Sequence, residues 1–194
     1  MTQSGRDPAA PLPCIVSVVG LKKSGKTAVV TALLSELRSR GHRVGSIKKM
    51  EHTLSLDAEG TDTRRHADAG AEVVVALLER ETVRFERSQP SRSMRDILEL
   101  FPRDTAFLVC EGMVDGDAPQ AIVLCLRTMD DLAETLTVRG IQAGTVLAVS
   151  GVAAAGDLNQ GAAGPGGIPV FNAADAVQRR ALTDLIIKKA CPDE

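Results

Sequence analysis

The chain is poor in aromatic residues: its 194 residues include four Phe and neither Trp nor Tyr. Its hydrophobic core must therefore be built from Val, Leu, Ile and Ala. Proteins that bind single-stranded nucleic acid stack bases on aromatic side chains, and those that bind duplexes carry a basic excess. With few aromatics and a formal net charge of -2, this sequence argues against nucleic acid as a partner.

Long apolar runs and close cysteine pairs are also missing. No run approaches the roughly 18 apolar residues that a membrane-spanning helix needs. Residues 1–13 hold three prolines and no apolar signal core, which predicts a disordered N-terminal lead. Cys14, Cys110, Cys125 and Cys191 lack the spacing of a metal cluster, and we expect free thiols rather than a disulfide framework. These absences predict a cytoplasmic protein without membrane contact.

The most informative stretch runs from Gly20 to Thr27 and reads Gly-Leu-Lys-Lys-Ser-Gly-Lys-Thr. Two glycines five apart, followed by Lys and Thr between an apolar run and an amphipathic stretch, are typical of a P-loop (Walker A). Lys26 would reach the terminal phosphates of a nucleotide, and the Thr27 hydroxyl would ligate Mg²⁺. The residues predicted to bind the nucleotide here are Gly20, Lys22, Lys23, Ser24, Gly25, Lys26, Thr27 and Ala28.

The rest of the chain alternates apolar runs with amphipathic stretches. This predicts an α/β fold over residues 14–194: a single P-loop nucleotide-binding domain, a three-layer sandwich with a mostly parallel sheet. Two short runs at 72–78 and 82–87, joined by a tight turn, predict an added β-hairpin, either buried or at a dimer edge. The expected sheet strands are 14–19, 44–48, 106–110, 121–126, 145–149 and 168–171. The expected helices begin near residues 26, 63, 93, 128 and 173, the last capped by Asn172 with Val177 facing inward.

Three carboxylates are candidates for the chemistry. Glu111 follows a short apolar strand directly, where a Walker B carboxylate would bind Mg²⁺ or its waters, although it could also be a surface residue opening a loop. Asp57 and Asp62 lie in a polar segment after the second strand, where many P-loop enzymes place groups near the γ-phosphate. That segment could equally be a solvated loop.

Several motifs together resemble one known family, the molybdopterin-guanine dinucleotide biosynthesis adaptor family, protein B. The matching motifs, in order and spacing, are Gly20 to Thr27, Arg40 to Lys48, Asp57 with Gly60, Asp62 and Arg65-His66, Ala69 to Ala71, and Cys110-Glu111-Gly112. The resemblance implies a P-loop GTP-binding protein with weak or partner-assisted GTPase activity. It also implies a homodimer that supports the guanylyltransferase attaching GMP to molybdopterin, with a molybdopterin-related ligand.

By this resemblance, Lys26, Asp57 and Asp62 would serve catalysis, Lys48 and Arg65 would join the nucleotide site, and Mg²⁺ would be held by Thr27 and Glu111. The chain departs from the family where a histidine-rich stretch is usual, because it has Lys-Lys-Met-Glu-His at 48–52. This departure leaves the P-loop intact and bears on whatever the histidines contact.

Two other functions fit the same loop. One is an ATP-dependent small-molecule P-loop kinase, and the other is a non-enzymatic, nucleotide-sensing scaffold dimer. No Asn-Lys-x-Asp guanine motif occurs, so the expectation of GTP depends on the family resemblance.

Overall fold

The computed structural model describes residues 12–50, 57, 59–86, 93–114, 120–155 and 163–190. The chain divides into two compact units, residues 1–50 with 101–194, and residues 51–100. This division does not test whether residues 14–194 form one domain, so the single domain expected from the sequence stays a prediction. Of the predicted N-terminal lead, residues 1–11 lie outside the described residues.

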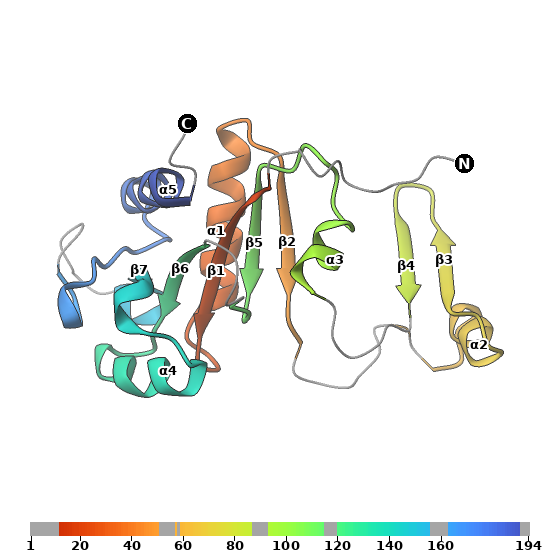
Figure 1. Ribbon diagram of the computed structural model, residues 1–194, viewed down its shortest axis with the longest axis horizontal. Coiled ribbons are helices and arrows are strands. Elements are labelled where there is room, and N and C mark those ends of the chain that lie inside the picture. The colour runs from red at the N-terminus through yellow and green to blue at the C-terminus, as the bar shows by residue number, and fades with distance from the viewer. Residues whose placement is uncertain are drawn as a thin grey trace. The chain divides into compact units, whose positions relative to one another are not determined.

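The first unit is built on a five-stranded parallel sheet in the order β2-β5-β1-β6-β7 (Figure 1). Its strands are β1 (Cys14–Gly20), β2 (Val44–Lys48), β5 (Phe107–Glu111), β6 (Gln120–Cys125) and β7 (Val146–Ser150). β1 occupies the centre and is buried along nearly its whole length, as expected for a parallel strand covered on both faces. The predicted α/β fold with a parallel sheet is confirmed.

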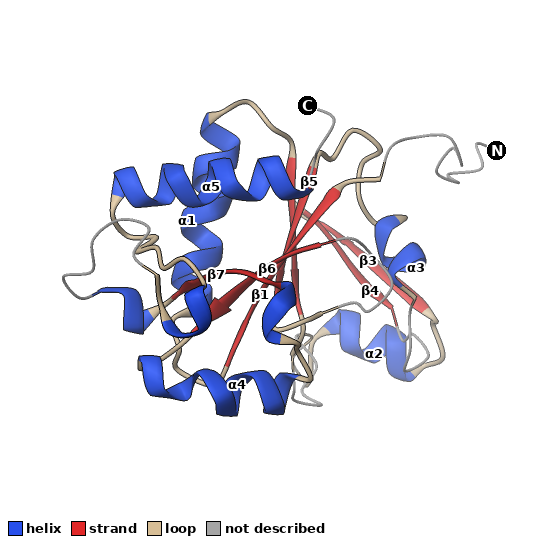
Figure 2. Ribbon diagram, turned by 60° about the vertical axis from the view of Figure 1, so that its left-hand side comes forward, coloured by secondary structure: helices blue, strands red, loops and turns tan. Residues whose placement is uncertain are grey.

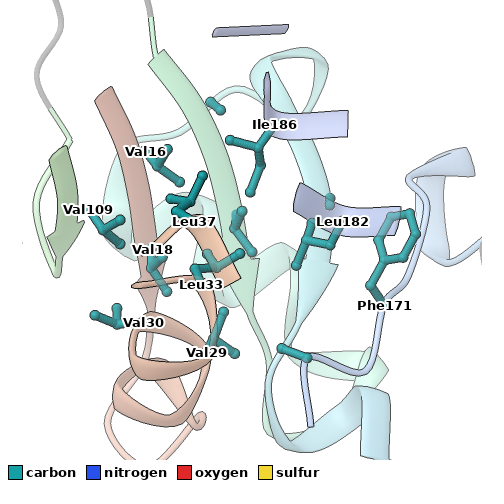
Figure 3. Packing of buried hydrophobic residues seen from close by; sticks show 14 of the residues in the cluster. Val16, Val18, Val29, Val30, Leu33, Leu37, Val109, Phe171, Leu182 and Ile186 are labelled. Atoms are coloured by element: carbon teal, nitrogen blue, oxygen red, sulfur yellow. The ribbon is translucent and has the colours of Figure 1, made fainter. Parts of the chain in front are cut away.

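Alternation along the strands decides which helices cover which face. On β1, Val16 and Val18 pack in one cluster with residues of α1 (Lys26–Ser39) and α5 (Ala176–Ala190), as Figure 3 shows. Val19 belongs to a second cluster, against which α4 (Leu132–Arg139) packs. Successive side chains of a strand point to opposite faces, so α1 and α5 cover one face and α4 the other. Figure 2 shows α1 and α5 close together and α4 apart from them.

Short 3-10 helices complete the first unit. They are η1 (Met129–Asp131), η2 (Ala143–Thr145), η3 (Val152–Ala155) and η4 (Pro165–Gly167). The predicted start near residue 128 is confirmed, because the Thr128 backbone amide donates to Asp131 at 3.2 Å as η1 leads into α4.

The second unit contains α2 (Asp62–Asp68), β3 (Val73–Leu77), β4 (Thr82–Glu86) and α3 (Met94–Leu98). β3 and β4 pair antiparallel, so the predicted hairpin is confirmed. A capping box of Ser93 and Asp96 begins α3, as the sequence indicates. One face of β3 is apolar and exposed, at Val73, Val75 and Leu77.

Two expectations at the C-terminal end are wrong. The strand expected at 168–171 is reduced to single bridges, such as Val149 to Val170, because Pro169 has no N–H to donate to a ladder. α5 begins at Ala176, three residues later than expected, and its first-turn amides are capped by Asp175 rather than Asn172. This later start turns Val177 outward, where it is 59% exposed.

The cysteines follow the prediction only in part. Cys110 and Cys125 are buried thiols that are not in a disulfide. Cys14 is disulfide-bonded, so the expectation of free thiols is wrong there. Cys14 opens β1 and is only partly buried, whereas Cys110 and Cys125 are enclosed by neighbouring strands. Cys191 lies outside the described residues.

A buried carboxylate joins α1 to α5. Glu36 is only 8% exposed and accepts from Arg40 Nε at 3.0 Å and Arg179 Nε at 3.4 Å. Arg40 also pairs with Asp184 at 2.5 Å. A buried charge is tolerated when it is paired in this way, so these contacts hold the P-loop helix α1 against α5.

Candidate functional site

The predicted P-loop forms the turn between the central strand and the first helix. β1 ends at Gly20 and α1 begins at Lys26, so the loop lies at the carboxyl edge of the sheet. Gly25 precedes the helix in a left-handed conformation with φ of 86°. Lys23 has φ of 65° and is the single non-glycine residue with positive φ in the described part of the chain. Such dihedrals turn successive amides toward one concavity, as phosphate binding requires.

Glycine is required at the loop's first position by close backbone approach. A Cβ on Gly20 would lie 2.2 Å from the carbonyl oxygen of Cys125 and 2.5 Å from Ser24 Oγ. The turn after β7 approaches the loop just as closely, because a Cβ on Gly151 would lie 2.2 Å from the Ser24 carbonyl oxygen. The Val152 amide donates to that same oxygen at 3.1 Å. The P-loop is therefore clamped between the ends of β6 and β7.

The loop suits a phosphate group in its polar atoms as well. Within the described residues, Ser24 is fully buried and its hydroxyl has no hydrogen-bond partner, and α1 begins without a side-chain cap. A buried hydroxyl without a partner is costly, and uncapped amides at a helix N-terminus attract anions. The loop residues thus fit a bound phosphate.

Lys26 folds back over the loop from the start of α1. Its Nζ donates to the carbonyl oxygens of Leu21 at 2.7 Å and Gly20 at 3.2 Å. The ammonium is therefore held over the loop, where the terminal phosphates of a nucleotide would lie. Lys22, Lys23 and Ala28 are exposed around it.

Thr27, Glu111 and Lys48 come together beside the loop. Thr27 Oγ1 donates to Glu111 Oε1 at 2.9 Å, and Lys48 Nζ lies 3.3 Å from the same oxygen. Strand register explains the meeting: Lys48 and Glu111 are partners at the ends of β2 and β5, and Glu111 shares a face with Phe107 and Val109, which pack with α1. Mg²⁺ usually takes one or two protein ligands and completes its shell with phosphate and water oxygens. Thr27 and Glu111 fit that requirement.

The remaining predicted residues lie in the second unit. Asp57 is buried and accepts from Thr61 Oγ1 at 2.8 Å and Thr63 Oγ1 at 2.7 Å, next to the start of α2. Asp62 and Arg65 pair with each other at 3.2 Å on the surface of α2. The catalytic roles of Asp57 and Asp62 and the binding role of Arg65 stay predictions.

Sequence reasoning missed two residues that touch the loop, Gly151 and Arg139. Arg139 is the last residue of α4, and its Nη2 donates to the Gly20 carbonyl oxygen at 2.6 Å. A basic residue at a helix end carries no sequence signal for this contact. For Gly151 there is a weak sequence signal, a glycine directly after the strand of residues 146–150, because a positive φ close to another backbone needs glycine.

A buried thiol lies directly behind the loop. Cys125 ends β6 opposite Gly20 in the register of the sheet. Burial raises the pKa of Cys125 to about 12, although the nearby Lys26 charge lowers it in part. The thiol is therefore protonated at neutral pH and serves as packing.

The central parallel sheet, the Walker A loop between its middle strand and the first helix, and the carboxylate ending the adjacent strand define the class of P-loop α/β proteins. Within that class, a family model described as Molybdopterin guanine dinucleotide synthesis protein B, MobB, matches residues 15–146. The match covers more than half of the sequence, so the chain belongs to the MobB family. The resemblance noted in the sequence is confirmed.

The chain is similar in sequence to proteins described as molybdopterin-guanine dinucleotide biosynthesis adapter proteins. It is 31% identical over 111 residues to a molybdopterin-guanine dinucleotide biosynthesis adapter protein of Haemophilus influenzae, covering 56% of this chain and 62% of that protein. It is 26% identical over 127 residues to a putative adapter protein of the same description from Methanocaldococcus jannaschii, covering 63% of this chain and 52% of that one. The chain thus spans between half and two thirds of the length of these curated relatives.

Solved structures share the fold. The crystal structure of Bacillus subtilis MobB matches 90% of this chain and 98% of that chain, with a TM-score of 0.64 and 24% identity. A crystal structure of molybdopterin-guanine biosynthesis protein B matches 88% and 96%, with a TM-score of 0.59 and 23% identity. In the described residues, no helix is long and apolar enough to cross a membrane.

Proposed function

We propose that the chain binds Mg·GTP at residues 20–27 and acts as an accessory protein in molybdenum cofactor biosynthesis, with weak or partner-assisted GTPase activity. The observation that carries the proposal is the 2.9 Å contact between Thr27 and Glu111 beside the P-loop. It brings together, from positions 84 residues apart, the two residues that we expect to hold Mg²⁺. The choice of GTP and of this pathway rests on membership of the MobB family.

Different residues of the site would bind the phosphate oxygens and the Mg²⁺ ion. The amides at the start of α1 and the Ser24 hydroxyl would hold phosphate oxygens, and Lys26 would turn from the loop carbonyls to the β- and γ-phosphates. Thr27 and Glu111 would hold Mg²⁺, which neutralises charge on the phosphates when bound. Asp57 or Asp62 would orient the attacking water, an assignment made by family resemblance.

Partners follow from the family and from one surface. Val73, Val75 and Leu77 form an exposed apolar stripe on β3, and Val75 is 52% exposed. Such a stripe on a two-stranded hairpin supports the proposed homodimer, because a second copy could cover it. A molybdenum cofactor guanylyltransferase and a molybdopterin-related ligand complete the proposal.

Thermal unfolding with and without nucleotide tests the binding site. A ligand at 100 times its dissociation constant stabilises a protein by about 2.7 kcal/mol, which for a chain of this size is a rise in Tm of roughly 5–10 °C. We expect this rise with Mg·GTP and a smaller one with Mg·ATP. Lys26→Ala should abolish it, and Lys188→Ala, which removes an exposed lysine of α5, should keep it.

The result can go against the proposal in two ways. An equal response of the Lys26→Ala and Lys188→Ala variants would remove the P-loop from the binding site. A rise with Mg·ATP alone would favour the kinase alternative. Single-turnover GTP hydrolysis, with and without a guanylyltransferase, then separates an assisted GTPase from a scaffold that does not hydrolyse.

A further inference from the structure

One carbonyl oxygen of the P-loop is held by two cationic side chains. The Gly20 oxygen accepts from Lys26 Nζ at 3.2 Å and from Arg139 Nη2 at 2.6 Å. A carbonyl oxygen has two lone pairs and can accept both bonds. The shorter bond comes from Arg139, which lies 119 residues further along the chain.

The two donors reach the loop from different elements. Lys26 opens α1, which covers one face of the sheet, and Arg139 ends α4, which packs on the other face. Gly140 stops α4 directly after Arg139 with φ of 64°. Arg139 is half-buried, so its guanidinium is held near the loop by the packing of α4.

Nucleotide binding requires one of the two donors, Lys26, to move, and the other, Arg139, to stay in place. Lys26 has to direct its ammonium at phosphate oxygens, which weakens or breaks its bonds to the loop carbonyls. A partly buried carbonyl that loses its donor carries a desolvation cost. The Arg139 guanidinium does not have to reach the phosphates, so it can keep donating to the Gly20 oxygen while Lys26 moves.

We propose that Arg139 is a positioning residue of the P-loop, which holds the Gly20 carbonyl in place so that Lys26 is released to the phosphates. This inference rests on the proposed nucleotide-binding function. It makes α4, which has no other assigned role, a part of the binding site. Arg139 acts through Gly20 and Lys26 and needs no contact with the nucleotide.

The test compares Arg139→Met, which removes every donor of the side chain, Arg139→Lys, and a matched control, Arg38→Met, which removes an exposed arginine of α1. Dissociation constants for a fluorescent GTP analogue with Mg²⁺ are measured by titration. We expect Arg139→Met to weaken binding by about five- to thirtyfold, the effect of leaving one carbonyl without its donor. Arg139→Lys should restore affinity to within about threefold, because an ammonium can also donate to the oxygen.

A second measurement separates positioning from simple loss of stability. Without nucleotide, Lys26 still donates to the Gly20 oxygen, so the urea midpoint of Arg139→Met should stay within about 0.5 M of the wild type. Affinity within twofold of the wild type in Arg139→Met would overturn the proposal, as would an equal loss in Arg38→Met. A large fall in the urea midpoint without rescue of affinity by Arg139→Lys would also overturn it.

The wild type and Lys26→Ala are titrated alongside. Should the wild type bind and Lys26→Ala fail to bind while Arg139→Met binds normally, the role of Arg139 is refuted and the proposed function stands. Should the wild type bind no nucleotide, both are refuted.

Discussion

An added methyl group at Gly151 should disturb the P-loop for two reasons, its positive φ and its close contact with the loop backbone. Gly151 has φ of 90°, and an added Cβ would lie 2.2 Å from the Ser24 carbonyl oxygen. A left-handed conformation costs an L-residue about 1–2 kcal/mol. Crowding a packed backbone adds about 1–3 kcal/mol. We therefore expect Gly151→Ala to lower the free energy of unfolding by roughly 2–5 kcal/mol.

Gly41 provides a matched control for the conformational part. Its φ is 88°, and an added Cβ would meet nothing within 4 Å. Gly41→Ala should therefore cost only the conformational term of about 1–2 kcal/mol. Urea unfolding of the two variants isolates the crowding term as the difference between them.

The binding consequence separates them further. Moving the Ser24 peptide displaces the amides that would hold phosphate, and an error of about 1 Å in a positioned group can cost around 100-fold. We expect Gly151→Ala to weaken Mg·GTP binding by roughly 10- to 100-fold and Gly41→Ala to leave it unchanged. Equal stability and equal affinity in the two variants would refute the reasoning that the turn after β7 clamps the P-loop.

Three other predictions test the surroundings of the site. Since burial raises the pKa of Cys125 from 9.0 to about 12, iodoacetamide at pH 8 should modify it about a thousandfold more slowly in the folded protein than in urea. Alkylation at equal rates in the folded and the unfolded protein would contradict the raised pKa of Cys125. Between about pH 9 and 12 the unfolded thiol loses its proton while the folded thiol keeps it, so the contribution of Cys125 to the free energy of unfolding should fall across that pH range. Glu36→Ala should cost about 1–3 kcal/mol in urea unfolding, because its two arginine partners lose a buried carboxylate but remain partly solvated, whereas Glu99→Ala, at an exposed site, should cost under about 0.5 kcal/mol. Val75→Asp should shift a dimer to monomer in sedimentation while Leu100→Asp, at a similarly exposed position, should not, and a dimer that survives Val75→Asp would place the interface elsewhere.

Local patterns in the sequence predicted much of the first unit. The strand at Val44–Lys48 has the bounds expected from its sequence, and Glu111 was recognisable because a carboxylate follows a buried apolar run. The contact of Glu111 with Thr27 also follows from general rules, since parallel strands end at one edge of the sheet.

Contacts that depend on packing between distant segments could not be predicted. The bond from Arg139 to Gly20 requires the placement of α4 on the sheet, which no local pattern encodes. Asp175 and Asn172 are both good helix caps, and only the backbone path after Phe171 decides between them. Pro169 was a sequence signal against a strand at 168–171, because proline has no N–H to donate to the hydrogen-bond ladder of a sheet.

The position of β1 in the sheet has a consequence for how the protein is made. β1 leaves the ribosome first among the strands, yet it pairs only with β5 and β6. About ninety further residues must be synthesised after Val16 before its partner in the sheet, Val109, exists. At the usual rates of synthesis this is roughly 5–20 s during which an apolar strand has no sheet partner. The hairpin of β3 and β4 pairs locally and can form within that interval. The phosphate-binding loop, which follows β1 directly, is therefore among the first segments synthesised and among the last to take its shape.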